Sequence, residues 1–159
     1  MANERKSILC DSILIEGSTI LGQKSEAVKD VKNLGDKELA VLSQLYVEMH
    51  KRDKMQSLSA VQLGLLSRIC AIRNEKGTII FMINPEIILK LGIRRVVEDC
   101  YSVNGKYKVF RPFIGCVRFY DVAGEKHVLF FKKDIIKLIA HEIDHMDGIL
   151  ITKGKRYDK

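Results

Sequence analysis

Several absences narrow the class of this 159-residue sequence before any motif is considered. It has only two prolines and no low-complexity tract, which excludes a fibrous or disordered chain. No window reaches the roughly eighteen consecutive apolar residues of a membrane span, and the opening MANERKSILCDS lacks the apolar stretch of a signal peptide. We therefore expect a single cytoplasmic domain over residues 1–159, with no membrane partner.

Cysteine is sparse, and its spacing excludes two common uses. None of the four cysteines forms a CxxC pair, so neither a zinc knuckle nor a dithiol redox motif is present. A cytosolic location favours reduced thiols over a disulfide framework. Any cysteine with a chemical role would act alone, and we interpret Cys10, Cys70 and Cys116 as small core residues.

Positive charge is in excess, and the whole excess lies in the later part of the sequence. The formal net charge is +7; residues 1–54 hold nine Lys/Arg and nine Asp/Glu, whereas residues 55–159 hold eighteen against eleven. The bases are scattered, without a basic helical stripe, zinc finger or aromatic RNA-binding signature, so we expect no sequence-specific nucleic-acid recognition. Two interpretations stay open: a solvated cationic surface and a docking surface for a polyanion.

The apolar pattern predicts two helices around short strands. Apolar residues at spacings of three and four predict a helix over 36–52 with Asp36 as N-cap, and Asp134 can cap a second helix that stops at Gly148. The first forty residues indicate irregular structure with one short strand at 12–15. Closely spaced β-rich runs favour antiparallel sheet in an α+β domain. These runs cover residues 68–72, 78–84, 87–91, 96–100, 108–110, 116–122 and 127–131.

The second predicted helix carries the motif with the most chemistry, His141-Glu142-Ile143-Asp144-His145. In this HExxH pattern the two histidines lie one helical turn apart on one face, so both imidazoles can reach one metal ion. Glu142 lies beside the first histidine, near enough to take a proton from a water that the metal activates. A catalytic site needs a third protein ligand, and no His or Glu follows His145, so the third ligand must lie upstream.

At this point the sequence resembles the peptide deformylase family. HEIDHMDGIL, residues 141–150, is similar to the family's HExDHxxGxL, and EDCYS, residues 98–102, is similar to its EGCLS. SLSAVQ, residues 57–62, stands in the place of the family's GLAAPQ, INPEI at 83–87 looks like the same family strand, and Arg111-Pro112 matches a frequent family pair. The resemblance implies antiparallel β-sheets packed around a central HExxH helix, with one further N-terminal helix.

The resemblance also implies a metal-ligand set and a reaction. The cysteine of the second motif, Cys100, would join His141 and His145, a thiolate and two imidazoles that suit Fe(II) or Zn(II), with Ni(II) or Co(II) as alternatives. The family hydrolyses the N-formyl group of newly made polypeptides and releases formate. Glu142 would be the general base, and the metal, the Gln62 amide and the Tyr101 backbone N–H would stabilise the oxyanion.

The match is weakest around the groove that would bind the substrate. Against the family's GxGLAAPQ the chain replaces both glycines, and Asp99 stands where the family has glycine. We assign Ser57, Leu58, Asp99 and Arg111 as candidate substrate-binding residues. Two alternatives therefore stay beside deformylation: a divergent hydrolase with another N-acyl substrate or weak activity, and a non-catalytic, metal-stabilised cationic binding module.

The basic C-terminal tail, residues 151–159, is the last candidate. If the substrate emerges from the ribosome, a run of cations at this end is a candidate for weak ribosome docking. The run consists of Lys153, Lys155, Arg156 and Lys159.

Overall fold

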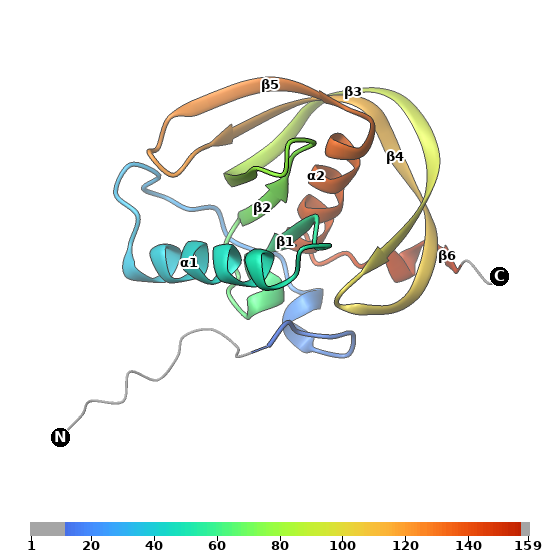
Figure 1. Ribbon diagram of the computed structural model, residues 1–159, viewed down its shortest axis with the longest axis horizontal. Helices are drawn as coiled ribbons and strands as arrows, with labels where there is room; N and C mark the ends of the chain where they lie inside the picture. The colour runs from blue at the N-terminus through green and yellow to red at the C-terminus, as the bar shows by residue number, and fades with distance from the viewer. Residues whose placement is uncertain (1–11, 157–159) are drawn as a thin grey trace.

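One antiparallel sheet organises the part of the chain that the computed structural model describes, residues 12–156. Its strand order is β1-β2-β3-β4-β5, and the short β6 pairs with β4. The strands β3, β4 and β5 curve around helix α2, as Figure 1 shows. The strands are β1 (Ser57–Ser59), β2 (Ile69–Arg73), β3 (Ile79–Cys100), β4 (Val103–Tyr120), β5 (Lys126–Lys132) and β6 (Lys155–Arg156).

The two α-helices, α1 (Asp36–Lys51) and α2 (Lys133–Met146), pack against opposite faces of β2. Side chains alternate between the two faces of a strand. Ile69 and Ala71 therefore join the core cluster under α1, while Cys70 and Ile72 join the cluster under α2. This double burial explains why β2 is an almost continuous apolar run. It also fixes α2, the helix of the HExxH motif, inside the concave side of the sheet (Figure 1).

The helices fall close to their predicted positions, but both predicted N-caps are wrong. Gly35 is the N-cap of α1 and Lys132 is the N-cap of α2, so Asp36 and Asp134 are already helical. At the end of α2, the Gly148 N–H donates to the carbonyl of His145 (3.1 Å) and the Ile149 N–H donates to that of Asp144 (2.8 Å). These are the two bonds of a Schellman motif, which needs a left-handed residue, and Gly148 has φ +73°. Gly148 therefore ends α2 at Met146, one residue after the second histidine of the motif.

The middle strands are longer than the sequence predicts. The runs at 78–84, 87–91 and 96–100 form one strand, β3, and the runs at 108–110 and 116–122 belong to β4. Gly92 and Gly105 do not separate strands; both lie inside them with positive φ, where the chain bends. Register shifts between Ile83/Glu86, Ile87/Leu89 and Glu98/Cys100 allow the pair to curve over α2.

Residues 12–35, which we call the N-terminal strap, wrap over the domain with only the 3-10 helix η1 (Thr19–Gly22) as regular structure. The predicted strand at 12–15 does not form. Instead, the Leu14 N–H donates to the Gln62 carbonyl (2.8 Å) and the Glu16 N–H to the Ser102 carbonyl (2.6 Å). Further along, the Asn84 side chain bonds both backbone groups of Val28.

Two residues with predicted roles lie near the ends of the chain. Cys10 and Lys159 lie outside the described residues, so the core role of Cys10 stays a prediction. The 3-10 helix η3 (Ile151–Lys153) leads into β6, which pairs with Tyr107 and Lys108 of β4. No helix within residues 12–156 is long and apolar enough to cross a membrane.

Candidate metal centre

Two elements bring the three candidate metal ligands together. His141 and His145 lie on one face of α2, as their i, i+4 spacing requires. Cys100 ends β3 directly before a two-residue turn, because it pairs with Val103, the first residue of β4. The tight turn projects the cysteine over α2. Cys100, His141 and His145 are the group of potential metal ligands that residues 12–156 contain.

The distances within this group fit one ion. Nε2 of His145 lies 3.2 Å from Sγ of Cys100 and 3.1 Å from Nε2 of His141. All three ligand atoms lie within 4.8 Å of one another. Metal–nitrogen and metal–sulfur bonds of about 2.0–2.3 Å can therefore span the group from one point. The two histidine side chains are almost fully buried, so water cannot compete freely for them.

Glu98 orients the first histidine from behind. Its Oε2 lies 2.9 Å from Nδ1 of His141, which leaves Nε2 of that ring facing His145. Arg111 binds the same carboxylate with two bonds, Nε to Oε1 (2.8 Å) and Nη2 to Oε2 (2.9 Å), and Nη1 also binds Asp144 (2.5 Å). Burial alone would raise the pKa of Glu98, but the bonds from Arg111 and His141 outweigh it and lower the pKa to about 2. Glu98 is therefore a permanent carboxylate.

The two histidines differ in their electrostatics. Burial lowers the pKa of His141, but the hydrogen bonds to Cys100 and Glu98 outweigh burial and raise it to about 10. Burial and the neighbouring His141 charge together hold the pKa of His145 well below its usual value. Nδ1 of His145 has no hydrogen-bond partner among the described residues. His145 is thus a neutral imidazole, the form that binds metals.

Gln62 extends from the 3-10 helix η2 (Ala60–Leu63) toward the cysteine. Its Oε1 accepts bonds from the Ser59 backbone N–H (3.0 Å) and hydroxyl (3.1 Å), which fixes the orientation of the amide. Its Nε2 then donates to the Ser102 hydroxyl (2.9 Å) and lies 3.7 Å from Sγ of Cys100. The arrangement aims an N–H donor at the sulfur of Cys100.

Glu142 is buried with a free oxygen. Its exposed fraction is 1%, and Oε2 has no hydrogen-bond partner among the described residues. Burial raises the pKa of this carboxyl, against the opposing effects of His141, Ser57 and Ser59. A raised pKa suits a group that must take up a proton and release it again near neutral pH.

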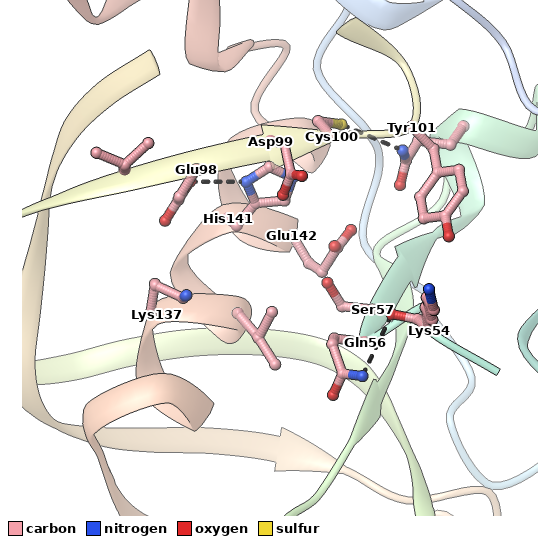
Figure 2. A pocket seen from close by; sticks show the side chains of 13 residues that line it. Lys54, Gln56, Ser57, Glu98, Asp99, Cys100, Tyr101, Lys137, His141 and Glu142 are labelled. Atoms are coloured by element: carbon pink, nitrogen blue, oxygen red, sulfur yellow. Dashed lines mark hydrogen bonds and ion pairs between the residues drawn. The ribbon is translucent and has the colours of Figure 1, made fainter. Parts of the chain in front are cut away.

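A cavity of about 430 Å³ opens onto these groups. Figure 2 shows Glu142 at its centre, with Cys100, Asp99 and Tyr101 on one side and Ser57 on another. Gln62 and His141 also line it. The volume accommodates a short peptide end rather than a folded partner.

Two of the four candidate substrate-binding residues lie elsewhere. Ser57 and Asp99 line the cavity. Leu58 does not, because its side chain points to the other face of β1 and is fully buried in the core under α1. Arg111 does not either, because its bonds to the buried Glu98 and the half-buried Asp144 hold it behind His141. Both assignments are corrected: Leu58 is a core residue, and Arg111 supports the ligand shell.

Two residues without a role predicted from the sequence, Glu98 and Ser59, hold other residues of the site in place. Glu98 was visible as the first letter of the EDCYS motif, two residues before the cysteine. Ser59 was visible as the start of Ser-x-x-Gln, the pattern in which a Ser N-cap and the Gln three residues later bond one another.

A half-buried cysteine and two buried histidines, grouped beside a glutamate that is not one of the ligands, form the arrangement of a metallohydrolase on an α+β fold. The sequence profile of the family "Polypeptide deformylase" matches residues 10–157. The chain therefore belongs to the polypeptide deformylase family, which is metal-dependent.

Individual relatives agree with this family assignment. "Peptide deformylase 2" of Clostridium acetobutylicum is 33% identical over 141 residues, covering 88% of this chain and 91% of the relative. The peptide deformylase of Agathobacter rectalis is 32% identical over 143 residues, covering 89% and 87%.

Solved structures share the fold. Plasmodium falciparum peptide deformylase in complex with an inhibitor superimposes with a TM-score of 0.79 at 28% identity, covering 91% of this chain and 88% of that one. Actinonin-bound class I type b peptide deformylase from Acinetobacter baumannii has a TM-score of 0.81 at 21% identity, covering 94% and 99%; its likeness concerns the fold alone.

Proposed function

We propose that Cys100, His141 and His145 hold one divalent transition metal, and that Glu142 works beside it as the acid–base group of deformylation. Membership of the family makes the chain a hydrolase that removes the N-formyl group from newly made polypeptides. The observation that carries the residue assignment is the buried, unpaired oxygen of Glu142 beside the three-ligand cluster.

The donor set supports Fe(II) or Zn(II), with Ni(II) or Co(II) as alternatives. One thiolate and two imidazoles are soft to intermediate ligands, which magnesium and calcium bind poorly. When bound, such a metal supplies Lewis-acid chemistry, because it lowers the pKa of a water molecule and polarises a carbonyl.

Glu142 moves the proton of the reaction. It takes a proton from the attacking water, whose oxygen forms a bond to the formyl carbon. It then gives that proton to the methionine nitrogen as the carbon–nitrogen bond breaks. The first products are formic acid and a free amine; the acid then gives its proton to the amine, which leaves formate and an ammonium terminus, so atoms and charge balance. Its raised pKa supports both halves of this transfer.

Gln62 and the Tyr101 backbone N–H stabilise the negative charge that develops on the formyl oxygen. The Gln62 amide is held by Ser59 before substrate binds, so little reorganisation is needed. Tyr101 lies in the turn after Cys100, and a backbone donor there tolerates any side chain. Ser57 and Asp99 line the path by which the peptide enters.

Formate release tests the assignment of Glu142. Metal-loaded protein should release formate from a formyl-methionyl peptide, and Glu142→Ala should lose nearly all activity while it retains the metal. Absence of formate with Fe(II), Ni(II) and Zn(II) would exclude deformylation; full activity in Glu142→Ala would remove Glu142 from the reaction. An acetyl-methionyl peptide, run in parallel, tests whether another N-acyl group is accepted.

Metal analysis tests the ligand set separately. Cys100→Ala should lower both stoichiometry and affinity, because two imidazoles alone bind weakly. Cys116→Ala is the matched control, since Cys116 is a buried thiol in β4 outside the ligand group. Unchanged metal binding in Cys100→Ala would refute the assignment.

The basic tail supports weak docking to the ribosome in the cytoplasm, where formylated chains emerge. Lys153 and Arg95 line a second cavity, of about 450 Å³, on the sheet. Polyanions such as ribosomal RNA are attracted to such clusters over about a Debye length. Neutralising Lys153, Lys155, Arg156 and Lys159 together should weaken co-sedimentation with ribosomes at low salt; unchanged binding would reject this docking.

A further inference from the structure

Two lysines line the catalytic cavity from different elements. Lys54 comes from the loop between α1 and β1, and Lys137 comes from α2. Lys137 precedes His141 by four residues, so it lies on the same face of the helix as the first histidine, one turn nearer the N-terminus. Figure 2 shows Lys54 and Lys137 on opposite sides of Glu142.

Neither lysine has a dedicated acidic partner. The Lys137 ammonium lies 3.8 Å from Oδ1 of Asp134, but the same oxygen lies 3.8 Å from Arg94, and the Asp134 side chain is 76% exposed. A solvated carboxylate shared between two cations compensates each of them only in part. Lys54 is exposed and makes no side-chain hydrogen bond or ion pair within residues 12–156.

The carboxylates that line the cavity do not balance the positive charge of the two lysines. Glu98 is neutralised by its two-bond pair with Arg111. Glu142 faces the reacting atoms and belongs to the chemistry. Asp99 is the one exposed carboxylate that lines the cavity, so its single charge faces two lysines.

The walls also define where each part of a substrate would lie. Val97, Leu138 and the methylene stem of Lys137 form an apolar surface beside the ligand cluster, suited to the methionine side chain. Because an extended chain advances about 3.3–3.6 Å per residue, the next two residues come within reach of the exposed Lys54 and of the half-buried Lys137, which both line the cavity.

We propose that Lys54 and Lys137 make this enzyme favour formyl-methionyl peptides with an acidic side chain at the second or third residue. The inference rests on the proposed function and adds a substrate preference to it. The two cations that line the cavity attract such a chain before and during docking, so the preference lies in KM rather than in the chemical step.

The test compares three peptides, formyl-Met-Ala-Glu, formyl-Met-Ala-Gln and formyl-Met-Ala-Lys. Each is amidated so that no terminal carboxylate contributes. At low salt the Glu peptide should have a KM about three- to tenfold below that of the Lys peptide, with similar kcat. The difference should shrink at roughly 0.5 M salt, where screening is strong. Equal KM values in wild-type protein at low salt would overturn the inference.

Variants assign the preference to the two lysines. Lys54→Gln and Lys137→Gln should each reduce the ratio of KM values, and Asp99→Asn should increase it because a repelling charge is lost. Lys126→Gln, at the start of β5 and away from the cavity, is the matched control. A ratio that neither lysine variant changes would refute the assignment to these residues. If no peptide releases formate, the proposed function fails; if all release it with equal KM, only the preference fails.

Discussion

The carboxylate of Glu98 lies 2.9 Å from Nδ1 of His141, on the ring nitrogen opposite the one that faces His145. The same carboxylate is held by Arg111 through two bonds. A buried ion pair on β3 and β4 thus determines which nitrogen of His141 faces the other two proposed metal ligands. Such supporting bonds fix the orientation of a ligand and raise its basicity.

Substitution of this carboxylate should weaken metal binding. We expect Glu98→Gln to lower metal affinity about 10- to 100-fold, because the amide holds His141 less firmly and leaves Arg111 without its charged partner. Competition with a chelator measures the affinity. Glu86→Gln is the control. Glu86 lies on β3, like Glu98, but forms an exposed ion pair with Arg118 of β4. Equal affinity in both variants would contradict the role of Glu98.

Gln62 should matter for turnover and not for metal binding. We expect Gln62→Ala to lower kcat about 100-fold or more, the usual loss for one donor to a developing oxyanion, with metal content unchanged. Ser59→Ala should have a smaller effect, because it removes one of the two bonds that orient the amide. Gln56→Ala serves as control from the same cavity. A Gln62→Ala variant with normal kcat and raised KM would indicate a binding role instead.

Metal affinity should rise with pH. Burial opposes protonation of His141, but its bonds to Cys100 and Glu98 prevail and raise the pKa to about 10. At pH 7, before a metal binds, both nitrogens of this ring therefore carry a proton. The metal must displace that proton, and affinity should increase about tenfold per pH unit for each proton released. Chelator competition between pH 6 and 9 tests this. A flat profile would show that His141 binds the metal without losing a proton.

The end of α2 should be sensitive to a single methyl group. Gly148 has φ +73°, and a Cβ there would lie 2.7 Å from the Gly22 carbonyl oxygen in the strap. We expect Gly148→Ala to lower the free energy of unfolding by about 1–3 kcal/mol, from backbone strain and the clash. Urea denaturation measures the change. At Gly22 an added Cβ meets nothing within 4 Å, so Gly22→Ala should be close to neutral.

The three proposed metal ligands could be predicted from the sequence to different degrees. His141 and His145 follow from local spacing on one helix, because i, i+4 residues share a face whatever the rest of the fold does. Cys100 followed only from the family resemblance, since its approach to α2 depends on a turn between two long strands. Arg111 was misassigned for the same reason: its partners, Glu98 and Asp144, are 13 and 33 residues away.

Strand boundaries were the weakest part of the fold prediction. Gly92 and Gly105 resemble turn residues in the sequence, but in an antiparallel pair a glycine with positive φ also permits a bend without ending the strand. Local pattern does not distinguish the two cases. The strand β2, by contrast, was predicted from the sequence, because its first four residues are all apolar. In the structure these four residues are buried, on both faces of the strand.

The N-terminal strap contains no candidate catalytic residue, yet it joins the two segments that carry Gln62 and Cys100. Leu14 binds the backbone of Gln62, and Glu16, two residues later, binds the backbone of Ser102 in the turn after the cysteine. The short stretch of main chain from Leu14 to Glu16 therefore helps to hold the Gln62 segment beside the Cys100 turn. A shortened protein that starts after Glu16 should retain α2 and both histidines but lose turnover. Two backbone hydrogen bonds near the N-terminus therefore set how much of the chain the enzyme needs.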